Sequence, residues 1–268
     1  MKKYILLLAI TLVSVHTWAQ ENRTKTLINA ALHGWEYELK AGFNIGGTLP
    51  LPFPEEIRNI KSYNPTLSIT IEGNMTKWLG EQKRWGVVTG LRLENKGMRT
   101  KAEVKNYGME IIGEDGNRLK GNWTGGVRTK VQNSYLTIPI LAAYKLNQRV
   151  NLKAGAYFSY LMDGDFSGHV YEGYLRKDDP TGEKVNFNNG AIASYDFSSD
   201  LRNFQWGAQL GVDWKAFKHL KVYADLNWGM NDIFNKDFKT ITFDMYAVYL
   251  NVGFGLSLIH ISEPTRPY

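Results

Sequence analysis

The sequence predicts an all-β chain that forms a closed eight-stranded antiparallel up-and-down transmembrane β-barrel with long extracellular loops. Segments 136–146 and 150–162 place an apolar residue at every second position, on either side of the polar turn 147–149. Each is long enough to cross a bilayer, which takes roughly 9–11 residues of tilted strand. Six further segments alternate in the same way. In lipid every backbone polar group must be paired, so such strands have to close into a barrel.

The predicted strands follow one another along most of the chain. Residues 35–45 alternate apolar and polar side chains without a fault. The proline-rich segment 46–65 that follows cannot lie in the interior of a sheet, so we expect a long loop there. The other strands are expected at residues 66–79, 85–98, 136–146, 150–162, 203–214, 220–230 and 244–256.

The lengths of the connections predict an orientation. Long connections follow the first, third, fifth and seventh strands, and short turns follow the second, fourth and sixth. Outer-membrane barrels keep their short turns in the periplasm and their long loops outside, so we expect both termini in the periplasm. The polar, glycine-rich segment 99–134 has a hairpin turn signal at residues 114–117. This pattern predicts a ribbon, with its tip near Gly116, that protrudes from the membrane.

The apolar side chains are expected to face lipid. Glycine recurs on the polar face, where a narrow interior needs room, and aromatic residues lie near strand ends, as they do at membrane interfaces. The predicted interfacial aromatics are Trp35, Trp78, Trp85, Tyr144, Trp214 and Trp228. A soluble lipocalin-like barrel, with its apolar face inward, is the alternative.

The polar face carries equal numbers of acidic and basic residues. Desolvated charges have to be paired, and an eight-stranded barrel is just wide enough for its own side chains to fill. We therefore predict a closed lumen that contains an ion-pair network. The residues of this network are Glu36, Glu38, Lys40, Glu72, Arg92, Glu94, Lys96, Lys145, Lys153, Asp213, Lys221 and Asp225.

The two ends of the chain are set apart from the barrel. The predicted divisions are a signal peptide at 1–19, a short periplasmic segment at 20–34, the barrel at 35–257 and a tail at 258–268. The first division has a charged start, a short apolar core and small residues before the cleavage site, which we place after Ala19. The tail contains Pro264 and Pro267, which cannot extend a strand, and we interpret it as a non-native read-through segment.

Composition narrows the possible functions. The chain has 268 residues, a formal net charge of +6 and no cysteine, so disulfides, thiolate metal sites and cysteine nucleophiles are excluded. The positive charge is not clustered in the sequence, and we attribute it to solvated loops. Nucleic acid is not an expected partner, because no recognition helix is present. Outer-membrane lipid and lipopolysaccharide are the expected surroundings.

Three stretches resemble the PorT-like outer-membrane β-barrel family of Bacteroidetes. They are the leader that ends in Ala19 before Gln20, the proline-rich loop Pro50–Pro65, and SYLTIPILAAYKL followed by a short turn and NLKAGAYFSYLM. The resemblance covers nearly the whole chain after the leader. It implies an OmpX-like or OmpA-like barrel in the outer membrane, a link to type IX secretion, and no catalytic residues.

The nearest approach to a catalytic site follows the strand at 150–162. A lipid-modifying enzyme, such as a lipid A hydrolase or acyltransferase, needs a serine, a histidine and an acid within hydrogen-bond reach. The candidates are Asp163, Asp165, Ser167 and His169. They alternate along one strand and share a face without converging, so we interpret them as polar residues that line a loop.

No metal or cofactor is expected. Calcium loops and zinc sites need ligands at characteristic spacings. The acidic and histidine candidates lack these spacings: Asp178, Asp179, Glu183, His33, His219 and His260.

The predicted function is a non-enzymatic outer-membrane barrel with a closed polar lumen. Its extracellular loops are expected to bind a protein, a glycan or lipopolysaccharide, or to support the envelope. A lipid-modifying enzyme and a small passive porin are the alternatives.

Overall fold

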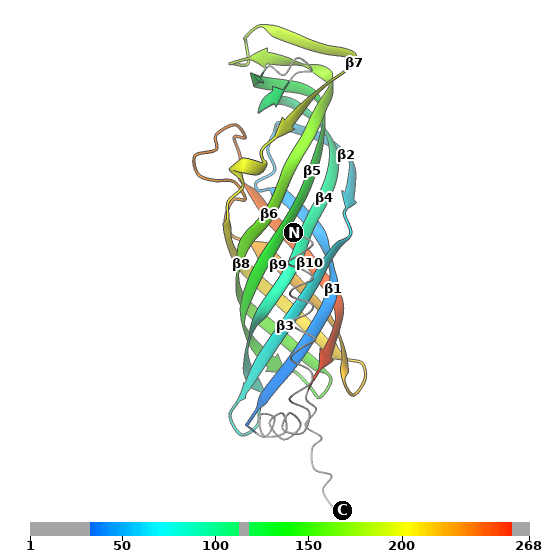
Figure 1. Cartoon of the computed structure of the whole chain (residues 1–268), viewed down its shortest axis with the longest axis vertical. Coiled ribbons are helices and arrows are strands. Elements are labelled where there is room, and N and C mark those ends of the chain that lie inside the picture. Colours follow the sequence, from blue (N-terminus) through cyan, green and yellow to red (C-terminus); the bar gives the residue numbers. More distant parts are fainter. Residues whose placement is uncertain (1–32, 113–117, 259–268) are drawn as a thin grey trace, which may run out of the picture.

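A computed structural model describes residues 33–112 and 118–258 as a closed ring of antiparallel strands (Figure 1). The described elements are β1 (Trp35–Pro50), β2 (Ile57–Pro65), β3 (Ser68–Leu79), β4 (Trp85–Ile112), β5 (Arg118–Lys145), β6 (Val150–Lys177), β7 (Lys184–Asp196), the 3-10 turn η1 (Ser198–Asp200), β8 (Phe204–Lys215), β9 (Leu220–Gly229) and β10 (Met245–Ser257). The predicted leader with its cleavage site, the turn signal at 114–117 and the tail from residue 259 lie outside the described residues.

Eight strands make the ring, in the order β1, β3, β4, β5, β6, β8, β9 and β10. Strand β10 closes it by pairing with β1, from Glu38 opposite Ser257 to Pro50 opposite Met245. The pairing of β4 with β5 completes the circuit on the other side. All these pairings are antiparallel, which confirms the predicted eight-stranded ring. No helix among the described residues is long and apolar enough to cross a membrane.

The wall of the ring alternates between apolar and polar side chains. On β3 the side chains of Ser68, Thr70 and Glu72 are buried, whereas those of Ile69 and Ile71 are about half exposed. The same alternation runs through all eight strands and makes an outer apolar belt around a polar lumen. The apolar face therefore points outward, as predicted, and the lipocalin-like alternative is excluded. We call this belted part of the ring the barrel.

At one end strands β4, β5 and β6 continue far beyond the belt, and we call this part the extension (Figure 1). Strands β4, β5 and β6 have 28 residues each, whereas crossing a bilayer takes roughly 9–11. Strand β7 pairs with β6, and β2 pairs with β4. The predicted ribbon is therefore present, and two further strands join it. The extension defines the long-loop end of the molecule, and the opposite end is the short-turn end.

Two segments that were expected to be long loops contain strands. Within 46–65 the chain completes β1 and then forms β2, whose neighbour in the sheet is β4. Proline is tolerated there because β2 is an edge strand. Within 163–202 strand β6 continues and β7 follows. The alternation on β6 was hidden by one-residue register shifts next to Met162 and Glu172, which exchange the inward and outward faces.

The extension has an apolar core of its own, in contrast to the polar lumen of the barrel. Strands β4 to β7 contribute to it, and so does the connection 230–244 between β9 and β10. Its buried members are Met98, Val104, Met109, Ile111, Trp123, Val127, Val131, Phe166, Val170, Leu175, Phe187, Ala193, Tyr195, Phe197, Leu201, Ile233, Phe234, Ile241, Met245, Ala247 and Tyr249. Burial of these side chains stabilises the extension as a folded unit.

The connection 230–244 is fixed at the long-loop end by backbone hydrogen bonds. The amide of Ile233 donates to the carbonyl of Met245 at 3.0 Å, and the amide of Asn235 donates to the carbonyl of Asp200 at 2.9 Å. Phe234, between these anchors, is 2% exposed. The connection therefore packs against the core of the extension and does not extend freely into solvent.

Candidate functional site

The first group of buried charges in the lumen is centred on Arg92 of β4. Its guanidinium pairs with Glu72, its cross-strand partner on β3, and lies 3.9 Å from the carboxylate of Glu94. It also donates to Gln209 Oε1 at 2.9 Å and to Asn227 Oδ1 at 3.2 Å, which reach it from β8 and β9. Each of the three guanidinium nitrogens therefore has an acceptor. This satisfies the requirement that a buried charge be both paired and hydrogen-bonded.

A second group of buried charges joins side chains of β1, β6, β8 and β9 inside the lumen. Lys40 Nζ lies 3.5 Å from Asp213 and 3.4 Å from Asp225. Lys153 Nζ lies 2.7 Å from Asp213 and 3.0 Å from Asp225. A methyl group at Gly211 would overlap the Asp225 carboxylate, so glycine at this position makes room for the charge cluster.

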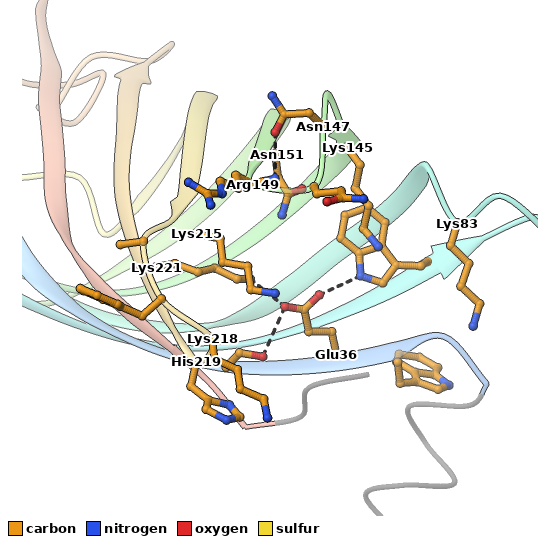
Figure 2. A pocket seen from close by; sticks show the side chains of 16 residues that line it. Glu36, Lys83, Lys145, Asn147, Arg149, Asn151, Lys215, Lys218, His219 and Lys221 are labelled. Atoms are coloured by element: carbon orange, nitrogen blue, oxygen red, sulfur yellow. Dashed lines mark hydrogen bonds and ion pairs between the residues drawn. The ribbon is translucent and has the colours of Figure 1, made fainter. Parts of the chain in front are cut away.

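A third group lies toward the short-turn end, where the lumen opens. Lys221 Nζ lies 2.7 Å from Glu36 (Figure 2). It also lies 3.4 Å from Glu38, and the indole N–H of Trp78 donates to Glu36 at 2.9 Å. Lys145 Nζ stands 4.0 Å from the centroid of the Trp78 ring. Glu36 and Lys145 are less buried than the other predicted lumen residues, because they lie at this mouth.

The lumen ends toward the extension at Lys96. Its ammonium group lies 3.1 Å from Glu94 Oε1. The rings of Tyr135, Tyr157 and Tyr249 surround it, with centroids at 5.1, 5.2 and 5.8 Å from Nζ. Three aromatic faces and one carboxylate stabilise this buried cation. The apolar core of the extension begins at the same level, since Tyr249 belongs to it.

The structure places all twelve predicted lumen residues on the inward face of the ring. Eleven of them form ion pairs within the set, and Lys145 contacts the Trp78 ring. The predicted network named charged residues alone, and neutral residues of the same inward face also lie buried among them. These are Asn44, Asn74, Thr137, Ser159, Gln205, Gln209, Asn227 and Asn251. Side chains therefore occupy the lumen, and its charged groups pair with one another.

Five of the six predicted interfacial aromatics lie on the outer face or at its edge. Trp85, Trp214 and Trp228 are 59%, 50% and 47% exposed. The rings of Trp85 and Tyr144 are in contact, with centroids 4.7 Å apart, and the Lys77 ammonium lies 4.9 Å from the centroid of the Trp35 ring.

Trp78 is the exception, and its prediction as an interfacial residue was wrong. It is 7% exposed and packs with Val88, Leu141 and Ala143 inside the short-turn end. The physical reason is its position on β3, because it lies an even number of residues from Glu72 and therefore points into the lumen.

The candidate catalytic residues lie on the extension and do not form a triad. Ser167 donates to Asp165 at 2.6 Å, and Asp165 also pairs with Lys130. Partial burial raises the pKa of Asp165, but the hydrogen bonds from Lys130 and Ser167 outweigh it and hold that pKa below its usual range. Asp165 is therefore an ion-pair partner. No contact recorded for the described residues joins His169 to Ser167 or to Asp163.

The metal-ligand candidates are also dispersed. Asp179 accepts hydrogen bonds from the backbone and side chain of Thr181, both at 2.7 Å, and Glu183 pairs with Lys177 at 2.9 Å. Within residues 33–112 and 118–258 no three His, Asp or Glu side chains gather in a way that could hold a metal ion. His260 lies outside these residues.

A protein-family comparison agrees with the geometry of the ring. The family model described as "Outer membrane protein beta-barrel domain" matches residues 18–235. A search of curated proteins found no match. Among solved structures, Ail of Yersinia pestis is 11% identical, with a TM-score of 0.36 and coverage of 83% of this chain and 98% of that one.

Two further structures show the same low level of similarity. OprG of Pseudomonas aeruginosa is 10% identical, with a TM-score of 0.31 and coverage of 85% of this chain and 98% of that one. The outer membrane protease OmpT of Escherichia coli is 11% identical, with a TM-score of 0.29 and coverage of 84% and 96%.

Proposed function

Because the chain belongs to the outer membrane protein β-barrel domain family, we propose that it is a non-enzymatic barrel with a closed lumen whose long-loop end binds a partner. The observation that carries the proposal is the change of interior along the ring. The barrel contains paired charges, whereas the extension contains an apolar core. Paired charges fill the lumen, and the core gives the extension a fixed surface that could be recognised.

We propose that the extension lies outside the cell and that both chain termini lie in the periplasm. Outer-membrane barrels have short periplasmic turns and longer outer loops. The connections at the short-turn end are 80–84, 146–149 and 216–219, and the 28-residue strands meet at the other end. The sequence of residues 1–19, which is typical of a signal peptide, supports export through the inner membrane.

We expect the purified protein to give no stable single-channel currents in planar bilayers. Side chains from all eight strands of the ring contact one another inside the lumen, so a hydrated ion would have to break buried ion pairs. The measurement compares the protein with a detergent blank and with a general porin at equal amounts. Stable currents would favour the small passive porin.

We expect a photo-crosslinking residue at Arg118, which is exposed on the extension, to capture a partner in intact cells. The matched control carries the same probe at Glu81, which is exposed in a turn at the opposite end. Mass spectrometry of the adduct would identify it as protein, glycan or lipopolysaccharide. If the Arg118 probe gives no adduct, or only the adduct that Glu81 gives, the long-loop end does not bind a partner.

We also propose that the chain is a PorT-like barrel of Bacteroidetes and that its partner belongs to type IX secretion. The support is the resemblance in the proline-rich segment Pro50–Pro65 and in the hairpin 134–162. In the structure the first segment contains β2, which is exposed along the edge of the extension. A type IX secretion component in the Arg118 adduct would support this assignment. An unrelated partner would contradict it.

A further inference from the structure

A cavity opens at the short-turn end of the barrel (Figure 2). Its volume is about 540 Å³, within the range of roughly 300–1,000 Å³ that is common for small-ligand sites. The turns 146–149 and 216–219 form much of its wall. Glu36 and Trp78 line it on the side that faces the lumen. The cavity is distinct from the extension, so its ligand does not depend on the partner proposed for the long-loop end.

The cavity is strongly basic. Its lining includes six cationic side chains and a single carboxylate: Lys83, Lys145, Arg149, Lys215, Lys218 and Lys221, and Glu36. That carboxylate is held at 2.7 Å by Lys221 and at 2.9 Å by the Trp78 indole. The described lining has no second carboxylate, so the cavity has a positive electrostatic potential that attracts anions.

The two turns are fixed before any anion binds. The Asn147 side-chain oxygen accepts hydrogen bonds from the amides of Arg149 and Val150, each at 2.8 Å. The amide of Lys215 donates to the Arg149 carbonyl at 2.7 Å, which ties the second turn to the first. Binding therefore orders little backbone, and most of the cost lies in the cationic side chains themselves.

The depth of the cavity indicates the class of anion. Trp35 lines the cavity and is one of the predicted interfacial aromatics, so we expect the cavity to lie near the level of lipid head groups. Phe217, another lining residue, is 71% exposed. Lysine and arginine together are the side chains that bind phosphate most readily. We propose that this cavity binds a phosphate group, supplied either by an anionic lipid head group or by free phosphate.

Two measurements on the mature chain distinguish the two sources. In the first, the protein in a zwitterionic detergent is titrated with inorganic phosphate by calorimetry. In the second, native mass spectrometry counts lipids retained from phosphatidylglycerol vesicles and from phosphatidylcholine vesicles. We expect binding in at least one of these measurements, and we expect the Arg149→Gln/Lys218→Gln variant to weaken it about tenfold. Both residues are exposed in turns, so the variant keeps the barrel intact.

The matched control is the Arg99→Gln/Lys101→Gln variant, which removes the same two charge types from exposed positions on β4. It should bind as the unaltered protein does. Retention of phosphatidylglycerol alone would assign the phosphate to a lipid head group, and calorimetric binding would show that free phosphate is accepted. Absence of binding in both measurements, or equal weakening by the two variants, would overturn the proposal.

Discussion

Replacing Arg92 by methionine is expected to lower the free energy of unfolding of the barrel by about 3–5 kcal/mol. The side chain is 1% exposed and pairs with Glu72, while Glu94 lies 3.9 Å away. Methionine keeps much of the length but leaves both carboxylates in the lumen without this cation. Gln209 and Asn227 also lose their donor. Urea unfolding in lipid vesicles, followed by tryptophan fluorescence, measures the loss.

The matched control is the exposed ion pair between Lys61 on β2 and Glu103 on β4, whose side chains are 50% and 48% exposed. Lys61→Met should change the unfolding curve little, because water screens an exposed pair. The Glu72→Gln/Arg92→Met double variant should lose less than the sum of its single variants, since the two residues are coupled. Additive losses, or an Arg92→Met curve equal to that of Lys61→Met, would contradict the buried network.

Arg92→Met should also leave the planar-bilayer current at the baseline. The remaining side chains still occupy the lumen. Lys96, surrounded by Tyr135, Tyr157 and Tyr249, also lies between the lumen and the extension. Destabilisation without conduction would show that the network supports the barrel and does not gate a channel.

The barrel was predictable because lipid outside and a narrow lumen inside force strict alternation. Ile71 and Glu72 illustrate this, since a shift of one residue would put the carboxylate in lipid. The same reasoning found the lumen residues but not all their partners. Glu72 and Arg92 are neighbours across one hairpin, whereas Lys40 meets Asp213 and Asp225 only because the ring closes.

The extension was only partly predictable because its pattern changes along each strand. On β4 the buried side chains larger than glycine are even-numbered as far as Val104 and odd-numbered at Met109 and Ile111, after a one-residue shift against β5. The outer face of the extension does not have to be apolar, as it would in lipid. Its sequence therefore lacks the strict alternation of apolar and polar residues that marks the barrel strands. The basic cavity could not be predicted from the sequence for another reason. Its cationic side chains come from separate turns, and only the closed ring brings these turns together.

Phe234→Ala is expected to release the connection 230–244 while the barrel stays folded. The Phe234 ring is 2% exposed, with its centroid 5.0 Å from that of Phe166 and 4.6 Å from that of Phe238. Loss of a buried phenyl group costs about 3–5 kcal/mol. Few backbone hydrogen bonds hold the connection to the sheet. The lost free energy should therefore lower the cost of opening this segment locally, without unfolding the barrel. Hydrogen exchange at the amide of Ile233, which donates to Met245, should accelerate by about two orders of magnitude or more.

Phe53→Ala is the matched control, since Phe53 is 56% exposed in the connection between β1 and β2. It should leave exchange at Ile233 unchanged. Amides of β8 and β9 inside the barrel should remain protected in both variants, because the polar lumen and the outer belt do not involve Phe234. If Phe234→Ala also exposes those amides, the extension and the barrel unfold as one unit. If Ile233 keeps its protection, the aromatic contacts do not hold the connection, and the fixed surface proposed for partner binding loses its physical basis.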